Sequence, residues 1–338
     1  MRCGPPSCLG PSRQGGFVLV ATLWVMVIVA IAAGYFAQRV ATAVDLARQA
    51  RQNSQSAIDM ASARAEVLYR LGTTSMTEYG LGRGDVATAL DNRPYRTTGD
   101  VLLRLQDSRG LFNLNVFEDE RLFRFLGIVG VAGAQRPRMI ATLRDYIDPD
   151  KLHRLNGAED DEYRALGLPP PANRNLITPW EASRIIGWRD KPELWRSGSL
   201  ADLTTAGSVM GLNPNTAPLE VLATLPGVTQ ETAQAIINRR RLTPITDLRD
   251  IAALTGLSTH QLMDEVAVIP SNAVRITQSA AKLPWALQYT ITLTPLSHEG
   301  PWRQDYFTRV QVSAPQTPSE SAPELPKRSE ARPEQNPV

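Results

Sequence analysis

Cysteine and histidine are scarce in this sequence. The chain has two cysteines and three histidines in 338 residues. Cys3 and Cys8 both precede a long apolar run, so the remainder has no thiol for a disulfide, a nucleophile or a metal ligand. His153, His260 and His298 lie far apart, at no spacing typical of metal ligands. The sequence therefore offers no recognisable catalytic residues, and we expect a protein that is not an enzyme.

An excess of charge of either sign is absent as well. Lysine and arginine number 36 against 34 aspartates and glutamates, which gives a formal net charge of +2. A balance this even provides no general field for nucleic acid or for an anionic lipid surface. Apolar residues make up 43% of the chain, enough for a packed core, and the length leaves room for two modest domains beyond a membrane segment.

Residues 17–37 carry no charge at all. At about 1.5 Å per residue, a helix of this length covers roughly the 30 Å hydrocarbon core of a bilayer. Arg2 and Arg13 precede the run, and basic residues before a spanning segment favour an orientation with the N-terminus inside. The run therefore predicts a transmembrane helix, with the bulk of the chain outside the cytoplasm.

The residues of this stretch leave three interpretations open. It fits a secretory signal cleaved before Ala33, whose flanking residues are small. It also fits an uncleaved signal anchor. The third interpretation is a type IV pilin-like leader, residues 1–16, cut between Gly16 and Phe17 so that Phe17 becomes the new N-terminus.

The helix is predicted to continue beyond the membrane. Residues 38–71 contain no proline or glycine, and Gly72 is a plausible terminator. A stripe of mostly small residues at alternating 4-3 spacing, which includes Ile58 and Leu68, predicts the face that packs on another element. A secretory signal has no need of such continuity, whereas a pilin subunit does.

Strand-like alternation occurs in two parts of the chain. It is clear at residues 101–105 and again at residues 285–294 and 306–313. We assign these strands to one antiparallel sheet, built from segments 72–115 and 268–314. A sheet that packs on a long N-terminal helix gives an α+β fold.

Two regions depart from this plan. Residues 116–267 show short helical patterns separated by proline and glycine, which predicts an inserted α-helical domain. Residues 315–338 are rich in proline, glutamate and serine and have almost no apolar anchor, so we predict a disordered tail.

An acidic segment lies within the helical region. It has two parts, Asp145-Tyr146-Ile147-Asp148-Pro149-Asp150 and Asn156-Gly157-Ala158-Glu159-Asp160-Asp161-Glu162-Tyr163. Oxygen ligands on a loop bent by proline and glycine suit Ca²⁺. Asp148 and Asp150, two residues apart around a proline, can face one ion, and Glu159 and Asp160 are the candidate ligands from the second part. A solvated acidic loop and a paired-carboxylate hydrolase are the other interpretations.

Residues 212–241 look like a helix-hairpin-helix. Pro226-Gly227-Val228 forms the predicted hairpin, and Thr229 caps the second helix. In DNA-binding versions a second glycine stands where this chain has Thr229, and backbone N–H groups meet a phosphate. Residues 239–241 are arginines, but they lie at the far end of the helix. A structural hairpin is favoured over a DNA-binding one.

Four segments, in this order, resemble the K-type minor pseudopilins of the bacterial type II secretion system, the general secretion pathway protein K family. They are the leader at Gly16-Phe17, the segment Asp107-Ser108-Arg109-Gly110-Leu111-Phe112-Asn113-Leu114-Asn115 (D-x-x-G-x-h-N-L-N, where h is hydrophobic), the acidic segment (D-W-x-D-x-D and G-A-E-x-x-x-Y) and Asn213-Pro214-Asn215-Thr216-Ala217 (N-x-N-T-A). Tyr146 replaces the usual tryptophan. The resemblance covers most of the chain to about Ser313.

Ala21 agrees with this resemblance. It is the fifth residue from Phe17, where most pilins carry a glutamate and K-type subunits do not. Cleavage leaves a positive amine in the bilayer, where a charge costs roughly 2.5–3.5 kcal/mol, and in a pilus the glutamate of an adjacent subunit can neutralise it. A subunit with no neighbour beyond it has no such amine to neutralise, so Ala21 is consistent with a tip position.

The resemblance implies a fold and a function. The fold is pilin-like α+β, interrupted by the helical insertion. The function is to cap and help initiate the pseudopilus that exports folded proteins across the outer membrane. The implied partners are I-type and J-type minor pseudopilins, other pseudopilins, prepilin peptidase and the inner membrane, which the chain would cross once with its C-terminal domain in the periplasm. Structural Ca²⁺ is implied and nucleic acid is not. A membrane-anchored DNA-binding module that uses the hairpin at Gly227, and a periplasmic hydrolase that uses the acidic segment, are the alternatives.

Overall fold

The computed structural model describes residues 15–97, 99, 101–195, 200–281, 283–311 and 322–326. The chain divides into two compact units, Met1–Gln55 and Ser56–Val338. Of the predicted leader, residues 1–14 lie outside the described residues.

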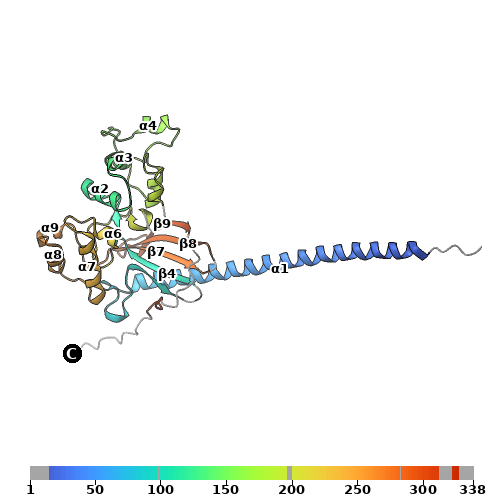
Figure 1. Cartoon of the computed structure of the whole chain (residues 1–338). Helices are drawn as coiled ribbons and strands as arrows, with labels where there is room; N and C mark the ends of the chain where they lie inside the picture. The colour runs from blue at the N-terminus through green and yellow to red at the C-terminus, as the bar shows by residue number, and fades with distance from the viewer. Residues whose placement is uncertain are drawn as a thin grey trace, which may run out of the picture. The chain divides into compact units, whose positions relative to one another are not determined.

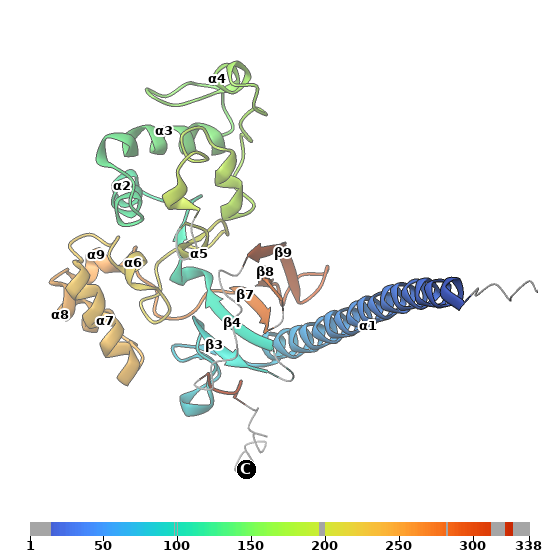
Figure 2. The same cartoon turned by 45° about the vertical axis from the view of Figure 1, so that its right-hand side comes forward.

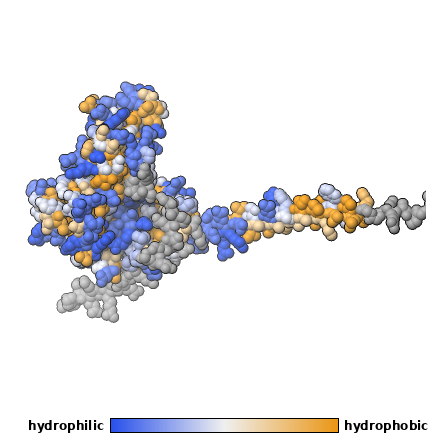
Figure 3. All heavy atoms as spheres, viewed as in Figure 1, coloured by the Kyte–Doolittle hydropathy of each residue, from blue (hydrophilic) through white to orange (hydrophobic). Residues whose placement is uncertain are grey.

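The first unit contains most of helix α1 (Gly15–Thr73), and the helix is unbroken as predicted. Its first turns are apolar and exposed along their length, as the orange spheres in Figure 3 show. Within the described residues, α1 is the one helix long and apolar enough to cross a membrane. These properties fit a single-pass membrane anchor.

The second unit is built on an antiparallel sheet that joins distant parts of the sequence (Figure 1). Its order is β3-β4-β7-β8-β9. The bounds are β3 Asp91–Arg96, β4 Val101–Asp107, β7 Ala273–Ala280, β8 Trp285–Leu293 and β9 Trp302–Gln311. Leu105 pairs with Ile276, so the predicted pairing of the early strand with the late ones is confirmed.

The last turns of α1 cover this sheet. Val67 and Leu71 belong to the same buried cluster as Leu103 and Tyr289, and all four are at most 3% exposed. The prediction of which face of the helix packs on the sheet was wrong, because Ile58, in the predicted stripe, is 58% exposed. Alanine-rich helices offer several apolar stripes, and contact with the sheet selects one of them.

The helical elements lie between β4 and β7 along the chain, as expected for an insertion. Figure 2 shows α2, α3 and α4 in one group and α6 to α9 in another. One continuous core joins them, and Trp188, Phe125 and Leu143 are fully buried in it. The elements of this region are β5 Phe112–Asn113, α2 Asp119–Ile128, η3 Gly133–Gln135, α3 Arg136–Ile147, α4 Asp160–Ala165, η4 Pro179–Arg184, η5 Pro192–Leu194, α5 Leu200–Leu203, β6 Thr204–Thr205, α6 Leu219–Leu222, α7 Gln230–Leu242, α8 Leu248–Thr255 and α9 Thr259–Met263.

Some local predictions differ from the structure. The sequence Asn92-Arg93-Pro94 is typical of a loop, yet it lies in β3, where a register shift between Asp91 and Pro94 accommodates a proline on an edge strand. Short elements complete the unit: β1 Met76–Thr77, β2 Gly80–Leu81, η1 Gly84–Val86 and η2 Ser108–Gly110.

The prediction of a disordered tail at residues 315–338 is wrong for residues 322–326. Ala322 and Leu325 are 3% and 6% exposed, and Leu325 joins the cluster between α1 and the sheet. The backbone of Arg96 in β3 makes two hydrogen bonds to this segment. Composition did not predict this ordered segment, because it contains only two apolar side chains that become buried, with prolines beside them.

Candidate functional site

Asp107, the first residue of the D-x-x-G segment, is fully buried at the end of β4. Its Oδ1 accepts hydrogen bonds from the Arg109 backbone N–H (3.1 Å) and from the Ser271 N–H and Oγ (2.9 and 2.7 Å). Its Oδ2 accepts from Asn213 Nδ2 (2.9 Å) and Thr216 Oγ1 (3.0 Å). We call these residues the Asp107 cluster. It connects β4, the N-x-N-T-A segment and the start of β7.

Burial raises the pKa of Asp107, and the hydrogen bonds from Ser271, Asn213 and Arg109 oppose that rise. A buried carboxylate of this kind is tolerated because its oxygens are satisfied. Two of the four segments that resemble the K-type family, D-x-x-G-x-h-N-L-N and N-x-N-T-A, therefore meet at the Asp107 side chain, which joins the sheet to the helical region.

Gly110 lets these segments come close. A Cβ at this position would lie 2.4 Å from Gln106 Nε2 and 2.7 Å from Thr216 Oγ1. The Gln106 amide donates to the Thr216 carbonyl oxygen across the same gap (3.1 Å). The glycine of the D-x-x-G pattern therefore has a packing function.

The asparagines of both patterns hold loops of the helical region. Asn113 donates to the carbonyls of Gly207 and Val209. Asn115 exchanges two hydrogen bonds with the backbone of Leu176. The sequence identified these asparagines only by resemblance to the family. In the structure, the NH₂ group of each side chain donates to backbone carbonyls, and its oxygen accepts from a backbone N–H.

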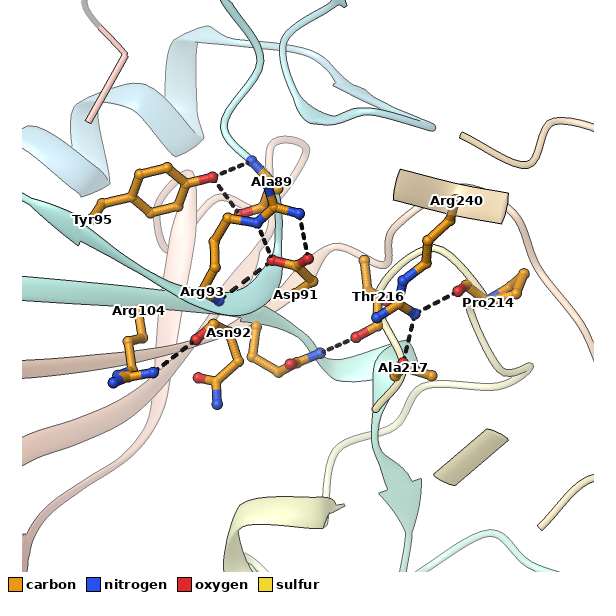
Figure 4. A network of polar contacts seen from close by, with 11 residues as sticks. Ala89, Asp91, Asn92, Arg93, Tyr95, Arg104, Pro214, Thr216, Ala217 and Arg240 are labelled. Carbon is orange, nitrogen blue, oxygen red and sulfur yellow. Dashed lines mark hydrogen bonds and ion pairs between the residues drawn. The ribbon is translucent and has the colours of Figure 1, made fainter. Parts of the chain in front are cut away.

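Asn215 has the same function at the hairpin. Its amide donates to the carbonyls of Ile245 and Val268 and accepts from the Ile245 N–H (2.8 Å). Arg240 adds to this support, because its guanidinium donates to the Pro214 and Ala217 carbonyls at 2.7 and 2.6 Å (Figure 4). Burial lowers the pKa of Arg240 to about 10.

The predicted hairpin is present, with Gly227 in a left-handed conformation (φ 71°) and Thr229 capping α7. Arg240 is half-buried and donates to backbone carbonyls, and Arg239 lies 3.5 Å from Asp250. The charge that could attract a phosphate is therefore largely committed within the chain, which favours the structural hairpin.

A second hairpin follows, which the sequence reasoning missed. Gly256 is also left-handed (φ 72°), and Ser258 caps α9 by accepting from the Gln261 N–H. The signal was an internal repeat, Leu225-Pro226-Gly227-Val228-Thr229 against Leu254-Thr255-Gly256-Leu257-Ser258. In both, a leucine precedes the glycine by two residues and a hydroxyl residue caps the next helix.

In the acidic segment, Asp145 is fully buried. It accepts hydrogen bonds from the Ala158 N–H (2.9 Å) and from the Arg154 guanidinium (2.9 Å). Gly157 packs so close that a Cβ there would lie 1.8 Å from Asp145 Oδ2. The Arg154 guanidinium also pairs with Asp148 and so bridges the two carboxylates.

Of the four predicted metal ligands, two have carboxylate oxygens in need of a partner. Both oxygens of Glu159 and Oδ1 of Asp148 are buried and make no regular hydrogen bond to the residues that the structure describes, although Glu159 also forms a capping box with Glu162 at the start of α4. Burial, together with the charges of Asp145 and Asp148, raises the pKa of Glu159 to about 7.

The other two predicted ligands already have partners. Asp150 accepts from the Leu152 N–H (2.7 Å), and Asp160 pairs with Lys151 (2.9 Å) in the first turn of α4. In the part of the chain that the structure describes, no three histidine, cysteine, aspartate or glutamate side chains are grouped closely enough to hold a metal ion. Gly16, Phe17 and Ala21 lie in α1 of the first unit.

Comparisons with known proteins agree on one family. Two family models described as "Type II secretion system (T2SS), protein K" match residues 102–195 and 212–269. A "Type II secretion system protein K" from Klebsiella pneumoniae is 24% identical over 294 residues, which cover 81% of this chain and 84% of that protein. Its counterpart from Pectobacterium carotovorum subsp. carotovorum is 24% identical over 210 residues, 55% of this chain and 60% of that protein's length.

The fold has a solved counterpart. It is a chain in "The Crystal Structure of the GspK-GspI-GspJ complex from enterotoxigenic Escherichia coli Type 2 Secretion System", with a TM-score of 0.59 and 18% identity. The match covers 78% of this chain and 99% of that chain. The order of the segments, the fold and these matches lead to one conclusion: the chain belongs to the type II secretion system protein K family, the K-type minor pseudopilins.

Proposed function

We propose that this minor pseudopilin caps the pseudopilus and helps to initiate it, with its anchor in the inner membrane and its second unit in the periplasm. One observation carries the tip position: the first acidic residue of α1 is Asp45, so the apolar part of the helix, including Ala21, has no carboxylate. Such a subunit cannot neutralise the amine of a subunit beyond it. It therefore fits the end of the filament.

The proposed partners are I-type and J-type minor pseudopilins. The solved structure that shares the fold is a complex of that composition. The exposed face of α1 offers small and apolar side chains for contact with their helices. Further partners are other pseudopilins and prepilin peptidase, which would cut between Gly16 and Phe17.

Gold labelling of sheared pseudopili tests the tip position. Label directed at this chain is expected at one end of each filament, while label on the major pseudopilin should run along the whole length as the control. Gold from this chain distributed along the filament would contradict the proposal.

We also propose that the acidic segment holds a structural Ca²⁺. The support is the set of unpartnered, buried oxygens on Asp148 and Glu159, because buried carboxylates normally have partners. Asp145, Asp150 and Asp160 are near enough for their charges to act on Glu159. The ion would supply positive charge that joins the loop after α3 to α4, in place of the Arg154 bridge.

Calcium titration calorimetry on the full chain checks this. We expect Glu159→Gln and Asp148→Asn each to weaken Ca²⁺ binding at least tenfold, because each removes an anionic ligand. Asp161→Asn is the matched control, since that carboxylate is 87% exposed and pairs with Arg164. Equal affinity in all four proteins would remove the site.

The pH dependence of stability gives a second prediction. The pKa of Glu159 is raised in the folded state, so without Ca²⁺ its contribution is fully present below about pH 4.5 and is lost as pH rises toward 7. With a chelator present we expect a loss of roughly 1–3 kcal/mol of unfolding free energy across this window. Added Ca²⁺ should reverse the loss, and Glu159→Gln should remove it. A flat wild-type profile between pH 4.5 and 7 in chelator would contradict this account.

A further inference from the structure

The outer edge of β3 is occupied by a distant part of the same chain. An edge strand presents unpaired backbone groups that can accept another strand. Here the Arg96 N–H donates to the Pro323 carbonyl (2.9 Å), and the Leu325 N–H donates to the Arg96 carbonyl (2.9 Å). These two bonds form a parallel bridge between Arg96 and Glu324.

Side chains complete the contact. Leu325 is 6% exposed and packs in the cluster that contains Val67 and Leu71 of α1 and Tyr95 of β3. Arg70 of α1 donates to the Pro326 carbonyl and also pairs with Glu66 (2.6 Å). The surface beside β3 therefore has an apolar floor between the sheet and α1, and a cationic donor at its end.

We propose that the edge of β3, together with residues 66–71 of α1, is a docking groove for an extended peptide, and that residues 322–326 are its ligand in the same chain. The ligand supplies apolar side chains at its first and fourth positions, Ala322 and Leu325. Residues 323 and 325 direct their backbone groups toward β3, and Pro326 has no N–H with which to extend the ladder to a further strand.

Occupation by the same chain is geometrically possible. β9 ends at Gln311, on the opposite edge of the sheet from β3. Four strand spacings of about 4.8 Å make a sheet roughly 19 Å wide. The ten residues 312–321 can span up to roughly 33–36 Å, enough to cross it.

The filled groove has two consequences. It closes an edge that could otherwise take a strand from a neighbouring subunit. It also holds the last turns of α1 against the sheet within the second unit. Residues 322–326 thus cover the edge of β3 and hold α1 against the sheet.

Peptide binding tests the groove. The ligand is a fluorescent synthetic peptide of residues 319–329, added to the full chain in detergent and to a chain ending at Gln311. We expect the shortened chain to bind it at least tenfold more tightly than the full chain, and to bind a Leu325→Asp peptide at least tenfold more weakly. Equal binding by both chains, or equal binding of both peptides, would overturn the proposal.

Hydrogen exchange on the full chain provides a test that needs no truncation. Leu325→Asp is expected to speed exchange of the Arg96 amide at least tenfold and to open the groove to the wild-type peptide. Leu296→Asp is the control, because Leu296 is 95% exposed and its change should leave both readouts unaltered. An unchanged Arg96 amide in Leu325→Asp overturns the proposal. Protection that disappears on dilution, together with a dimer by light scattering, would overturn occupation by the same chain and assign the ligand to a second copy.

Discussion

Replacing Asp107 by alanine is expected to lower the free energy of unfolding by roughly 3–5 kcal/mol. The change removes the acceptor of five hydrogen bonds around a fully buried side chain. The five donor groups belong to Arg109, Ser271, Asn213 and Thr216. Each buried donor left unpaired costs about 1–3 kcal/mol, and these costs do not add fully. Denaturant unfolding in detergent, followed by tryptophan fluorescence, measures the loss, since Trp188 is buried in the helical core.

The Asp107→Asn variant tests the role of the negative charge, because the asparagine side chain has nearly the same shape as aspartate but is neutral. The amide keeps one acceptor oxygen, which can serve Ser271 and Arg109, but directs an NH₂ group at Asn213 and Thr216. An intermediate loss is therefore expected. Asp119→Ala is an exposed control and should change stability by no more than about 0.5 kcal/mol. If Asp107→Ala were as mild as this control, the cluster would not be what joins the sheet to the helical region.

Gly157→Ala is the second change for which we expect a large effect, about 3 kcal/mol of unfolding free energy. The new Cβ would lie 1.8 Å from Asp145 Oδ2 and 3.1 Å from the Arg154 carbonyl oxygen. Asp145 cannot yield easily, because it is buried and held by Ala158 and Arg154. The same shift should weaken Ca²⁺ binding by the acidic segment, and calorimetry measures both quantities.

Gly133→Ala is the matched control. A Cβ on Gly133 meets no atom within 4 Å, and its backbone is not left-handed. This variant should stay within about 0.5 kcal/mol of the wild type. Equal stability of the two alanine variants would show that the loop around Gly157 relaxes freely, against the rigid packing described here.

Much of the fold followed from periodicity. The charge-free run, the absence of glycine between residues 38 and 71, and the alternation at residues 285–294 were enough for the long helix and the strands that pack on it. β3 was missed because Pro94 suggests a loop, and only its position at a sheet edge makes the proline acceptable. The tail strand was missed because its order comes from Arg96 and α1, far away in the sequence.

The site was predicted unevenly for a related reason. Resemblance identified Asp107, Gly110 and the asparagines, but their functions depend on contacts between distant parts of the sequence that no local pattern shows. The contacts of Asp107 with Asn213 and Thr216 span more than 100 residues. Of the four ligands predicted in the acidic segment, Asp148 and Glu159 have buried carboxylate oxygens without a hydrogen-bond partner among the described residues. Asp150 and Asp160 make local hydrogen bonds and ion pairs, which a list of acidic residues does not distinguish from ligands.

The mass of the mature N-terminus tests the account most directly. Under the proposed function, the chain is held in the membrane with Phe17 as its first residue, after prepilin peptidase has removed residues 1–16. Mass spectrometry of the chain from cells with the peptidase is expected to give Phe17 as the first residue, and from cells without it an intact leader. A first residue of Ala33, or Met1 retained in the presence of the peptidase, would contradict assembly of this chain into a pseudopilus.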